Sequence, residues 1–170
     1  VDVNKGDEDE RTPLYITALY GYGSIVEILS RFEGVDVNKG NKYQLTALHL
    51  ATSKGHTSVV EILLKVEGID VNKETDLGFT SLELAFEKGH EAIVELLLSQ
   101  KDIDVKNKSE ALLHFAAEKG LSSLLESIIR TKEVNVNEAR GGGWMPLHLA
   151  ASEGHTSVVE ILLKVEGIDV

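Results

Sequence analysis

The sequence repeats itself, and this internal repeat constrains the fold more than any single motif does. Residues 55–71 recur unchanged at 154–170, and aligning 46–71 with 145–170 gives 22 identities in 26 positions. The block that opens each copy begins at Thr12, Thr46, Thr80, Ala111 and Met145. Successive copies therefore start 34, 34, 31 and 34 residues apart. A period of this length predicts a stack of similar units rather than one central core.

Within each copy the apolar residues follow helical spacing in two short stretches. In the copy at 35–68, Leu48 and Ala51 lie on one helical face, and Gly55 is a natural end for that helix. The next stretch, 57–64, opens with Thr-Ser, which can cap a helix, and continues with apolar residues three and four apart. Helices this short are marginal alone, so they must bury their apolar faces against neighbouring copies.

Four motifs recur from copy to copy. They are the helix-opening block at 46–49, Ala-Ala-x-x-Gly-His at 150–155, Val-Val-Glu-x-Leu-Leu at 59–64 and Asp-Val-Asn at 70–72. Together they resemble the ankyrin repeat, and the resemblance covers the whole chain. It implies an all-α ankyrin repeat solenoid of helix-turn-helix units with short β-hairpin fingers, forming a single domain over 1–170. The implied repeats are 1–34, 35–68, 69–102, 103–133 and 134–167, with 168–170 starting a further one.

The fourth repeat is shorter than the others. Ile103 and Ala111 are 8 residues apart, whereas the matching step is 11 in every other repeat. The loss falls in the polar turn, so we expect a shortened finger at 106–110. The last repeat keeps the apolar residues of an internal one, and 1–4 match the tail of a missing one. We therefore expect other repeats or a cap to cover the terminal units, as in a piece cut from a longer array.

The six histidines are the obvious candidates for a metal site, but their spacing argues against one. His49 and His56 are separated by about 10.5 Å along a helix, whereas the ligands of one zinc lie about 2 Å from the metal. Glutamates such as Glu61 and Glu160 occur once per repeat, as expected on a solvated face. Glycines 141–143 are not followed by the Gly-Lys-Ser/Thr of a phosphate loop, and the chain has no cysteine. We predict that the chain is not an enzyme and holds no metal or cofactor.

Charge and hydropathy limit the partners. With 17 basic and 28 acidic residues the formal charge is −11, which argues against nucleic acid and against anionic membrane surfaces. No apolar run approaches the roughly 18 residues of a membrane-spanning helix, and the start does not read as a signal peptide. We expect an intracellular, cytoplasmic protein that binds a protein or peptide. The acidic run at 7–10 favours a basic partner.

The resemblance implies a concave binding groove made of finger tips and exposed first-helix positions. Mapped onto this chain, the candidate partner-binding residues are Arg11, Leu19, Tyr20, Tyr43, Leu45, Lys54, Leu77, Phe79, Glu87, Lys88, Glu118, Lys119, Trp144 and Glu153. Trp144 is an aromatic residue of the type that anchors interfaces. Leu45 and Phe79 can either face a partner or pack between the fingers.

Three substituted or repeated positions carry further expectations from the resemblance. The opening-block histidine of the family bonds to backbone at the turn, so Tyr15 and Glu83, which replace it, should lose part of that network. Asn72 best matches the asparagines that a cytosolic hydroxylase modifies.

The function that the resemblance implies is a non-catalytic protein–protein interaction module. The alternative is a regulatory or targeting segment of a larger enzyme, channel or effector whose active domain lies outside this chain.

Overall fold

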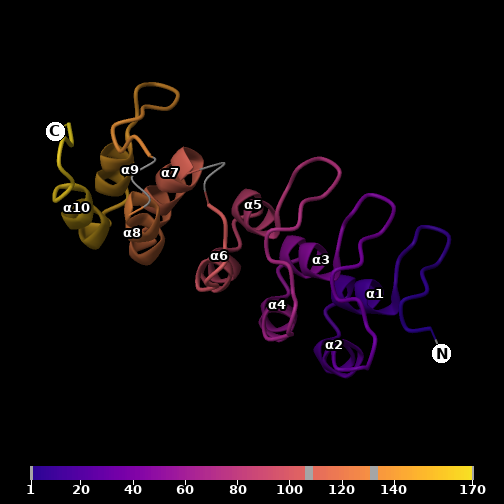
Figure 1. Cartoon of the computed structure of the whole chain (residues 1–170). Coiled ribbons are helices and arrows are strands. Elements are labelled where there is room, and N and C mark those ends of the chain that lie inside the picture. Colours follow the sequence, from indigo (N-terminus) through magenta and orange to yellow (C-terminus); the bar gives the residue numbers. More distant parts are fainter. Residues whose placement is uncertain (1, 106–108, 131–133, 170) are drawn as a thin grey trace. The chain divides into compact units, whose positions relative to one another are not determined.

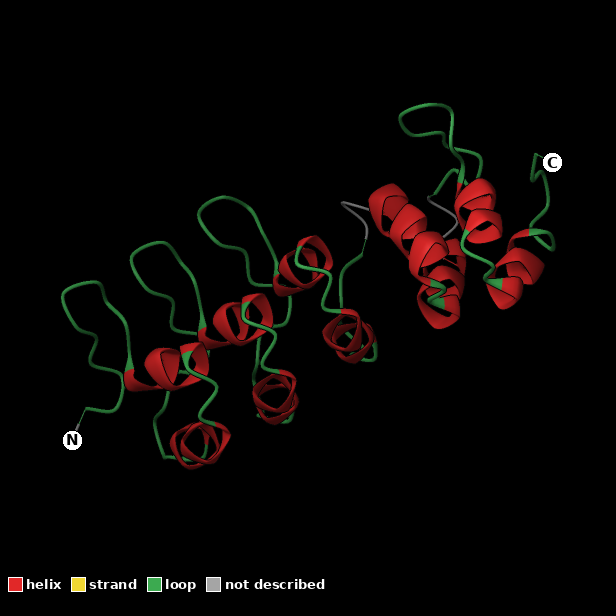
Figure 2. Cartoon of the chain, turned by 180° about the vertical axis from the view of Figure 1, so that it is seen from behind, coloured by secondary structure: helices red, strands yellow, loops and turns green. Residues whose placement is uncertain are grey.

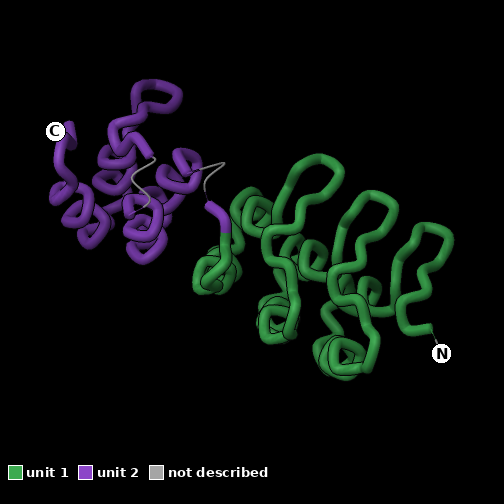
Figure 3. The backbone as a smooth tube through the Cα atoms, in the orientation of Figure 1, with its two compact units in different colours: residues 1–103 green, residues 104–170 purple. Residues whose placement is uncertain are grey.

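The computed structural model describes residues 2–105, 109–130 and 134–169. These residues contain ten helices and form two compact units, unit 1 (1–103) and unit 2 (104–170), which Figure 3 shows in different colours. The predicted all-α architecture is confirmed. That all five repeats form one continuous domain stays a prediction.

Unit 1 contains the first three repeats, each with two short antiparallel helices. Its helices are α1 (Pro13–Leu19), α2 (Gly23–Ser30), α3 (Ala47–Ser53), α4 (Thr57–Leu64), α5 (Ser81–Glu87) and α6 (Glu91–Leu98). The first helices, α1, α3 and α5, pack in one row and the second helices, α2, α4 and α6, pack in another (Figure 1). The unit is therefore a two-layer stack, as the repeat period predicts.

Unit 2 contains the last two helix pairs. Its helices are α7 (Ser109–Lys119), α8 (Ser122–Arg130), α9 (Pro146–Ser152) and α10 (Thr156–Leu162). Helix α7 packs on α8 and α9, and α10 packs on α8 and α9. Helix α7 begins at Ser109, so Ser109 and Glu110, which were expected in a shortened finger, belong to the helix instead. The rest of that predicted finger, 106–108, lies outside the described residues.

The helix boundaries follow from local chemistry within a repeat. The Thr46 hydroxyl accepts the His49 N–H at 3.4 Å, and Thr80 and Thr12 cap α5 and α1 in the same way. Each first helix of unit 1 ends near a glycine with positive φ, as at Gly55 (φ +73°), a conformation that favours glycine. Each repeat thus specifies where its own helices start and stop.

The fingers are tight turns closed by backbone hydrogen bonds. In the second finger, Asn41 N–H donates to Leu45 O at 3.0 Å and Gln44 N–H donates to Asn41 O at 2.8 Å. The finger of the last repeat has the same pattern and forms an isolated β-bridge between Arg140 and Trp144. Among the described residues the fingers contain no longer strand, so each predicted hairpin is reduced to its turn (Figure 2).

Neighbouring repeats are joined by apolar packing and by a ladder of asparagine side chains. Val60, Leu63 and Leu97 are completely buried, and each such side chain contributes about 1.5–3 kcal/mol on burial. Asn38 Nδ2 donates to Gly68 O at 2.7 Å, while its Oδ1 accepts the Asp70 N–H at 2.8 Å. Asn4 makes the equivalent pair of bonds to Gly34 O and the Asp36 N–H. Asn137 makes them to Gly167 O and the Asp169 N–H. These asparagines therefore brace the turns, as the sequence predicts.

Candidate functional site

Four of the histidines, His49, His56, His90 and His155, bond to a backbone carbonyl of a neighbouring repeat. No group of three histidine, aspartate or glutamate side chains among the described residues could hold a metal ion. His56 Nε2 donates to Leu19 O at 3.1 Å, and His155 Nε2 donates to Glu118 O at 2.9 Å, so these side chains link one repeat to the one before it. Within the described residues, no helix has both the length and the apolar character needed to cross a membrane.

His49 shows how an opening-block histidine works in this chain. It is 1% exposed; its Nδ1 accepts the Thr46 N–H at 3.1 Å, and its Nε2 donates to Lys73 O at 2.9 Å in the following turn. Burial lowers the pKa of the His49 imidazole below its ordinary value. Burial therefore favours the neutral ring, which braces two repeats through these bonds.

The two residues that replace this histidine each make a different bond. Glu83 keeps the capping half, because its carboxylate accepts the Thr80 N–H at 2.8 Å. Tyr15 reaches the next finger, where its hydroxyl accepts from Asn41 Nδ2 at 3.3 Å. Asn41 Oδ1 in turn accepts the N–H groups of Tyr43 and Leu45, both at 3.0 Å. The network in the first repeat is thus rebuilt around the tyrosine hydroxyl rather than simply lost.

The acidic run in the first finger is partly neutralised. Arg11 forms a salt bridge to Asp7 at 2.7 Å and a longer one to Asp9 at 3.5 Å, and Lys42 from the next finger also pairs with Asp9. The hydrogen bond from Arg11 lowers the pKa of the Asp7 carboxyl. Arg11, a candidate binding residue, is therefore engaged within its own finger.

The finger tips of unit 1 lie side by side and present apolar side chains. Lys42 N–H donates to Asp9 O at 3.2 Å, and Asp76 N–H donates to Tyr43 O at 3.1 Å, so each tip is tied to the next. Tyr43 is 56% exposed with the Lys42 ammonium over its ring, and Leu77 is 83% exposed. The structure thus brings together two of the predicted residues on one connected surface.

The remaining candidate residues of unit 1 differ in the solvent exposure of their side chains. Tyr20 follows α1, is 61% exposed and stacks on Tyr22 with ring centroids 5.8 Å apart. Leu19, Leu45 and Phe79 are only half-buried, which is consistent with partial packing among the fingers. The charged candidates Lys54, Glu87 and Lys88 are exposed.

Unit 2 contributes four candidates. Trp144 is 45% exposed, and its ring leans on the His148 ring with centroids 6.2 Å apart. Glu118, Lys119 and Glu153 are exposed, and Glu118 and Lys119 form a salt bridge at 3.1 Å. The candidate residues therefore form two sets, ten in unit 1 and four in unit 2.

Asn72 belongs to the asparagine ladder. Its Nδ2 donates to Asp102 O at 2.6 Å, and its side chain is half-buried. A modifying enzyme would have to pull this amide out of the ladder first. Hydroxylation of Asn72 stays a prediction.

Sequence reasoning missed an apolar surface on the second helix of the first repeat. Ile28 is 70% exposed on α2, and Phe32, two residues beyond the end of that helix, is 51% exposed. The position of Phe32 carried a signal, because the equivalent residue of the second repeat is the smaller Val66.

Comparison with known proteins agrees with the repeated helix pairs of the structure. A family model described as ankyrin repeats (3 copies) matches residues 14–109 and 113–170. Over 52 residues, or 31% of the chain, it is 36% identical to human "Ankyrin repeat and SAM domain-containing protein 3", of which it covers 8%. Over 52 residues it is also 40% identical to "26S proteasome non-ATPase regulatory subunit 10" of Dictyostelium discoideum, of which it covers 22%.

Proposed function

The chain belongs to the ankyrin repeat family, and we propose that it binds a partner protein or peptide, without catalysis, through its finger tips and the exposed ends of its first helices. Ankyrin repeats are in general protein–protein interaction modules. The finer assignment to particular residues of this chain is our proposal.

The observation that carries the proposal is the linked row of finger tips in unit 1. Backbone hydrogen bonds at 3.2 and 3.1 Å hold the three tips in register. On this frame Tyr43 and Leu77 are more than half exposed, and Tyr20 is exposed beyond the end of α1. Aromatic and aliphatic side chains on a rigid support make good anchors, because little conformational entropy is lost when they are buried by a partner.

The charge around this row favours a partner with some basic character. Asp7 and Asp9 form salt bridges within the protein, so the excess negative charge of the first finger lies on Glu8 and Glu10, which are both exposed. Glu87, the last residue of α5, adds a further exposed carboxylate next to Lys88. Electrostatic steering by these groups would be modest and would weaken as salt is raised.

Trp144 is the proposed anchor of unit 2. It follows two glycines with positive φ, at 142 and 143, and its indole faces solvent on one side and His148 on the other. A large, partly exposed aromatic ring of this kind contributes strongly when a partner covers it.

The second candidate function is a regulatory or targeting segment of a longer protein. It is favoured by the coverage of the relatives, because the chain spans only 8% and 22% of the two proteins named above. In that case the same surface would recruit or position an activity located elsewhere. A cytoplasmic location also stays a prediction.

The test is comparative capture of partners by the whole chain and two variants. One variant combines Tyr20→Ala, Leu77→Ala and Trp144→Ala, all at exposed residues, so the fold should be kept. The matched control combines Ile28→Ala, Phe32→Ala and Leu163→Ala, which are also exposed and apolar but lie outside the fingers and first helices.

We expect the first variant to lose a partner that wild type and control both retain. Removing three anchors should weaken its binding at least about tenfold, since a single hot-spot residue contributes about 2 kcal/mol. Retention by the first variant, or an equal loss in the control, would contradict the assignment. Circular dichroism of all three proteins would show that each is folded.

A further inference from the structure

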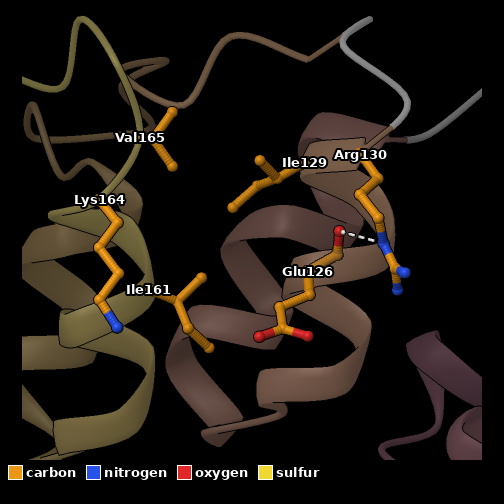
Figure 4. Close-up of a pocket in the computed structure, with 6 residues that line it drawn as sticks. All are labelled: Glu126, Ile129, Arg130, Ile161, Lys164 and Val165. Carbon is orange, nitrogen blue, oxygen red and sulfur yellow. Dashed lines mark hydrogen bonds between the residues drawn. The ribbon is translucent and has the colours of Figure 1, made fainter.

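A pocket lies between the second helices of unit 2, α8 and α10. Its volume is about 370 Å³, towards the small end of the range for ligand sites. The pocket is lined by Glu126, Ile129, Arg130, Ile161, Lys164 and Val165. In Figure 4 the side chains of Ile129, Ile161 and Val165 point towards one another across the gap between the helices. These three aliphatic residues are half-buried and form an apolar floor.

The charged residues around this floor give the pocket a positive balance. Arg130 and Lys164 outnumber Glu126, in a chain whose formal charge is −11. Arg130 Nε donates to Glu126 O at 3.4 Å, and one of its terminal nitrogens donates to Ser127 Oγ at 3.4 Å. Among the described residues, neither Arg130 nor Lys164 forms a salt bridge, and both are exposed. In Figure 4 the Lys164 ammonium lies next to Ile161, whereas the Arg130 guanidinium points away from the floor. Lys164 is therefore the cation available to a ligand that is both anionic and aliphatic.

The chain contains a matched pocket with different chemistry. It lies between α2 and α4 of unit 1, has a volume of about 450 Å³ and includes Ile62, Lys65 and Val66, the equivalents of Ile161, Lys164 and Val165. There Glu27 forms a salt bridge to Arg31 at 2.7 Å, so that cation is already neutralised.

Two further residues separate the two pockets. Glu67 lines the unit 1 pocket and adds a second carboxylate, whereas its equivalent Glu166 does not line the unit 2 pocket. Ser30 stands where unit 2 has the aliphatic Ile129. The unit 1 pocket is therefore electrically balanced and more polar. It serves as an internal control for the unit 2 pocket.

We propose that the pocket between α8 and α10 binds the C-terminal residue of a partner protein when that residue is aliphatic. The aliphatic side chain packs on Ile129, Ile161 and Val165, and the terminal carboxylate pairs with Lys164. A C-terminus suits a pocket of this size because it carries the carboxylate on the same residue as the apolar group. This site is separate from the fingers and first helices, so it does not depend on the proposed function.

The test is a titration of the whole chain, labelled for amide NMR, with a short peptide ending in a free leucine carboxylate. The comparison is the same peptide with a C-terminal amide, which keeps the side chain and removes the charge. We expect shifts at Ile161, Lys164 and Val165, and binding of the acid about fivefold tighter than that of the amide, as for an exposed ion pair. Equal affinities, or shifts confined to other residues, would overturn the proposal.

Variants at an exposed lysine locate the charge effect without disturbing the fold. Lys164→Glu should abolish the preference for the acid, and Lys164→Arg should keep it. Lys65→Glu, the equivalent change in the unit 1 pocket, should leave binding of the peptide acid unchanged. The variant that combines Tyr20→Ala, Leu77→Ala and Trp144→Ala should also leave it unchanged. If Lys65→Glu weakened binding as much as Lys164→Glu did, general charge attraction would explain the result and the assigned pocket would be wrong.

Discussion

Replacing Gly55 by alanine tests whether histidine packing holds neighbouring repeats together. Gly55 has φ +73°, and a Cβ built there would lie 2.9 Å from His90 Cε1, closer than real contacts allow. Gly154 is followed by the same residues as Gly55 and has φ +76°, but no atom of the described residues lies within 4 Å of its added Cβ. The two positions therefore share a backbone penalty and differ in the histidine contact, and the exposed residue before the glycine is Lys54 in one and Glu153 in the other.

The expected magnitudes follow from these two terms. An alanine held at positive φ costs about 1 kcal/mol, at either position. At Gly55 the alanine also displaces His90, whose Nε2 donates to Ser53 O at 3.3 Å. Losing this bond and its packing adds about 1–2 kcal/mol. Gly55→Ala should thus lower the free energy of unfolding by about 2–3 kcal/mol, and Gly154→Ala by about 1 kcal/mol.

Urea denaturation followed by circular dichroism would measure both changes. A double-mutant cycle isolates the contact: in a His90→Ala background, Gly55→Ala should cost only the backbone part, about 1 kcal/mol. The reasoning is refuted if the two glycine variants are equally destabilised. It is also refuted if Gly55→Ala has the same effect with and without His90.

Two predictions concern titration. Burial lowers the pKa of His49, so the unfolded chain binds more protons, and stability present above the unfolded-state pKa of about 6.5 is lost as pH falls towards the folded-state value. The melting temperature should drop on acidification by less in His49→Gln than in wild type, and an equal drop in both proteins would contradict this cause. In the first finger, Arg11 lowers the pKa of Asp7, so Arg11→Gln should return it towards its ordinary value in a carbon NMR titration. An unchanged Asp7 titration would disprove that cause.

Most helix boundaries could be predicted because they depend on residues within one repeat. A threonine hydroxyl opens each first helix of unit 1, and a glycine such as Gly55 follows each one. The exception is α7, which starts at Ser109, two residues before Ala111, the first residue of its opening block. Glu110 suits the first turn of a helix because it is acidic. Ser109 Oγ donates to Val105 O at 2.8 Å, and the two residues form the start of α7 rather than part of a finger.

The candidate surface was less predictable because its properties depend on lateral contacts between repeats. The pairing of Asp9 with Lys42 joins residues 33 positions apart, and it reduces the acidic excess that the sequence suggests. The pocket between α8 and α10 arises in the same way, from residues of two repeats. A motif within one repeat does not predict contacts between side chains of neighbouring repeats.

The second and fifth repeats show that a side chain's environment depends on its neighbours as well as its own repeat. Residues 46–71 and 145–170 are nearly identical, yet His49 is 1% exposed and bonded to Lys73 of the next repeat, whereas His148 is exposed beside Trp144. The same histidine is therefore part of the core in one repeat and part of the surface in the other. Candidate binding residues in a repeat chain must accordingly be chosen by contact rather than by motif, which favours Tyr43, Leu77 and Trp144 over Leu45 and Phe79.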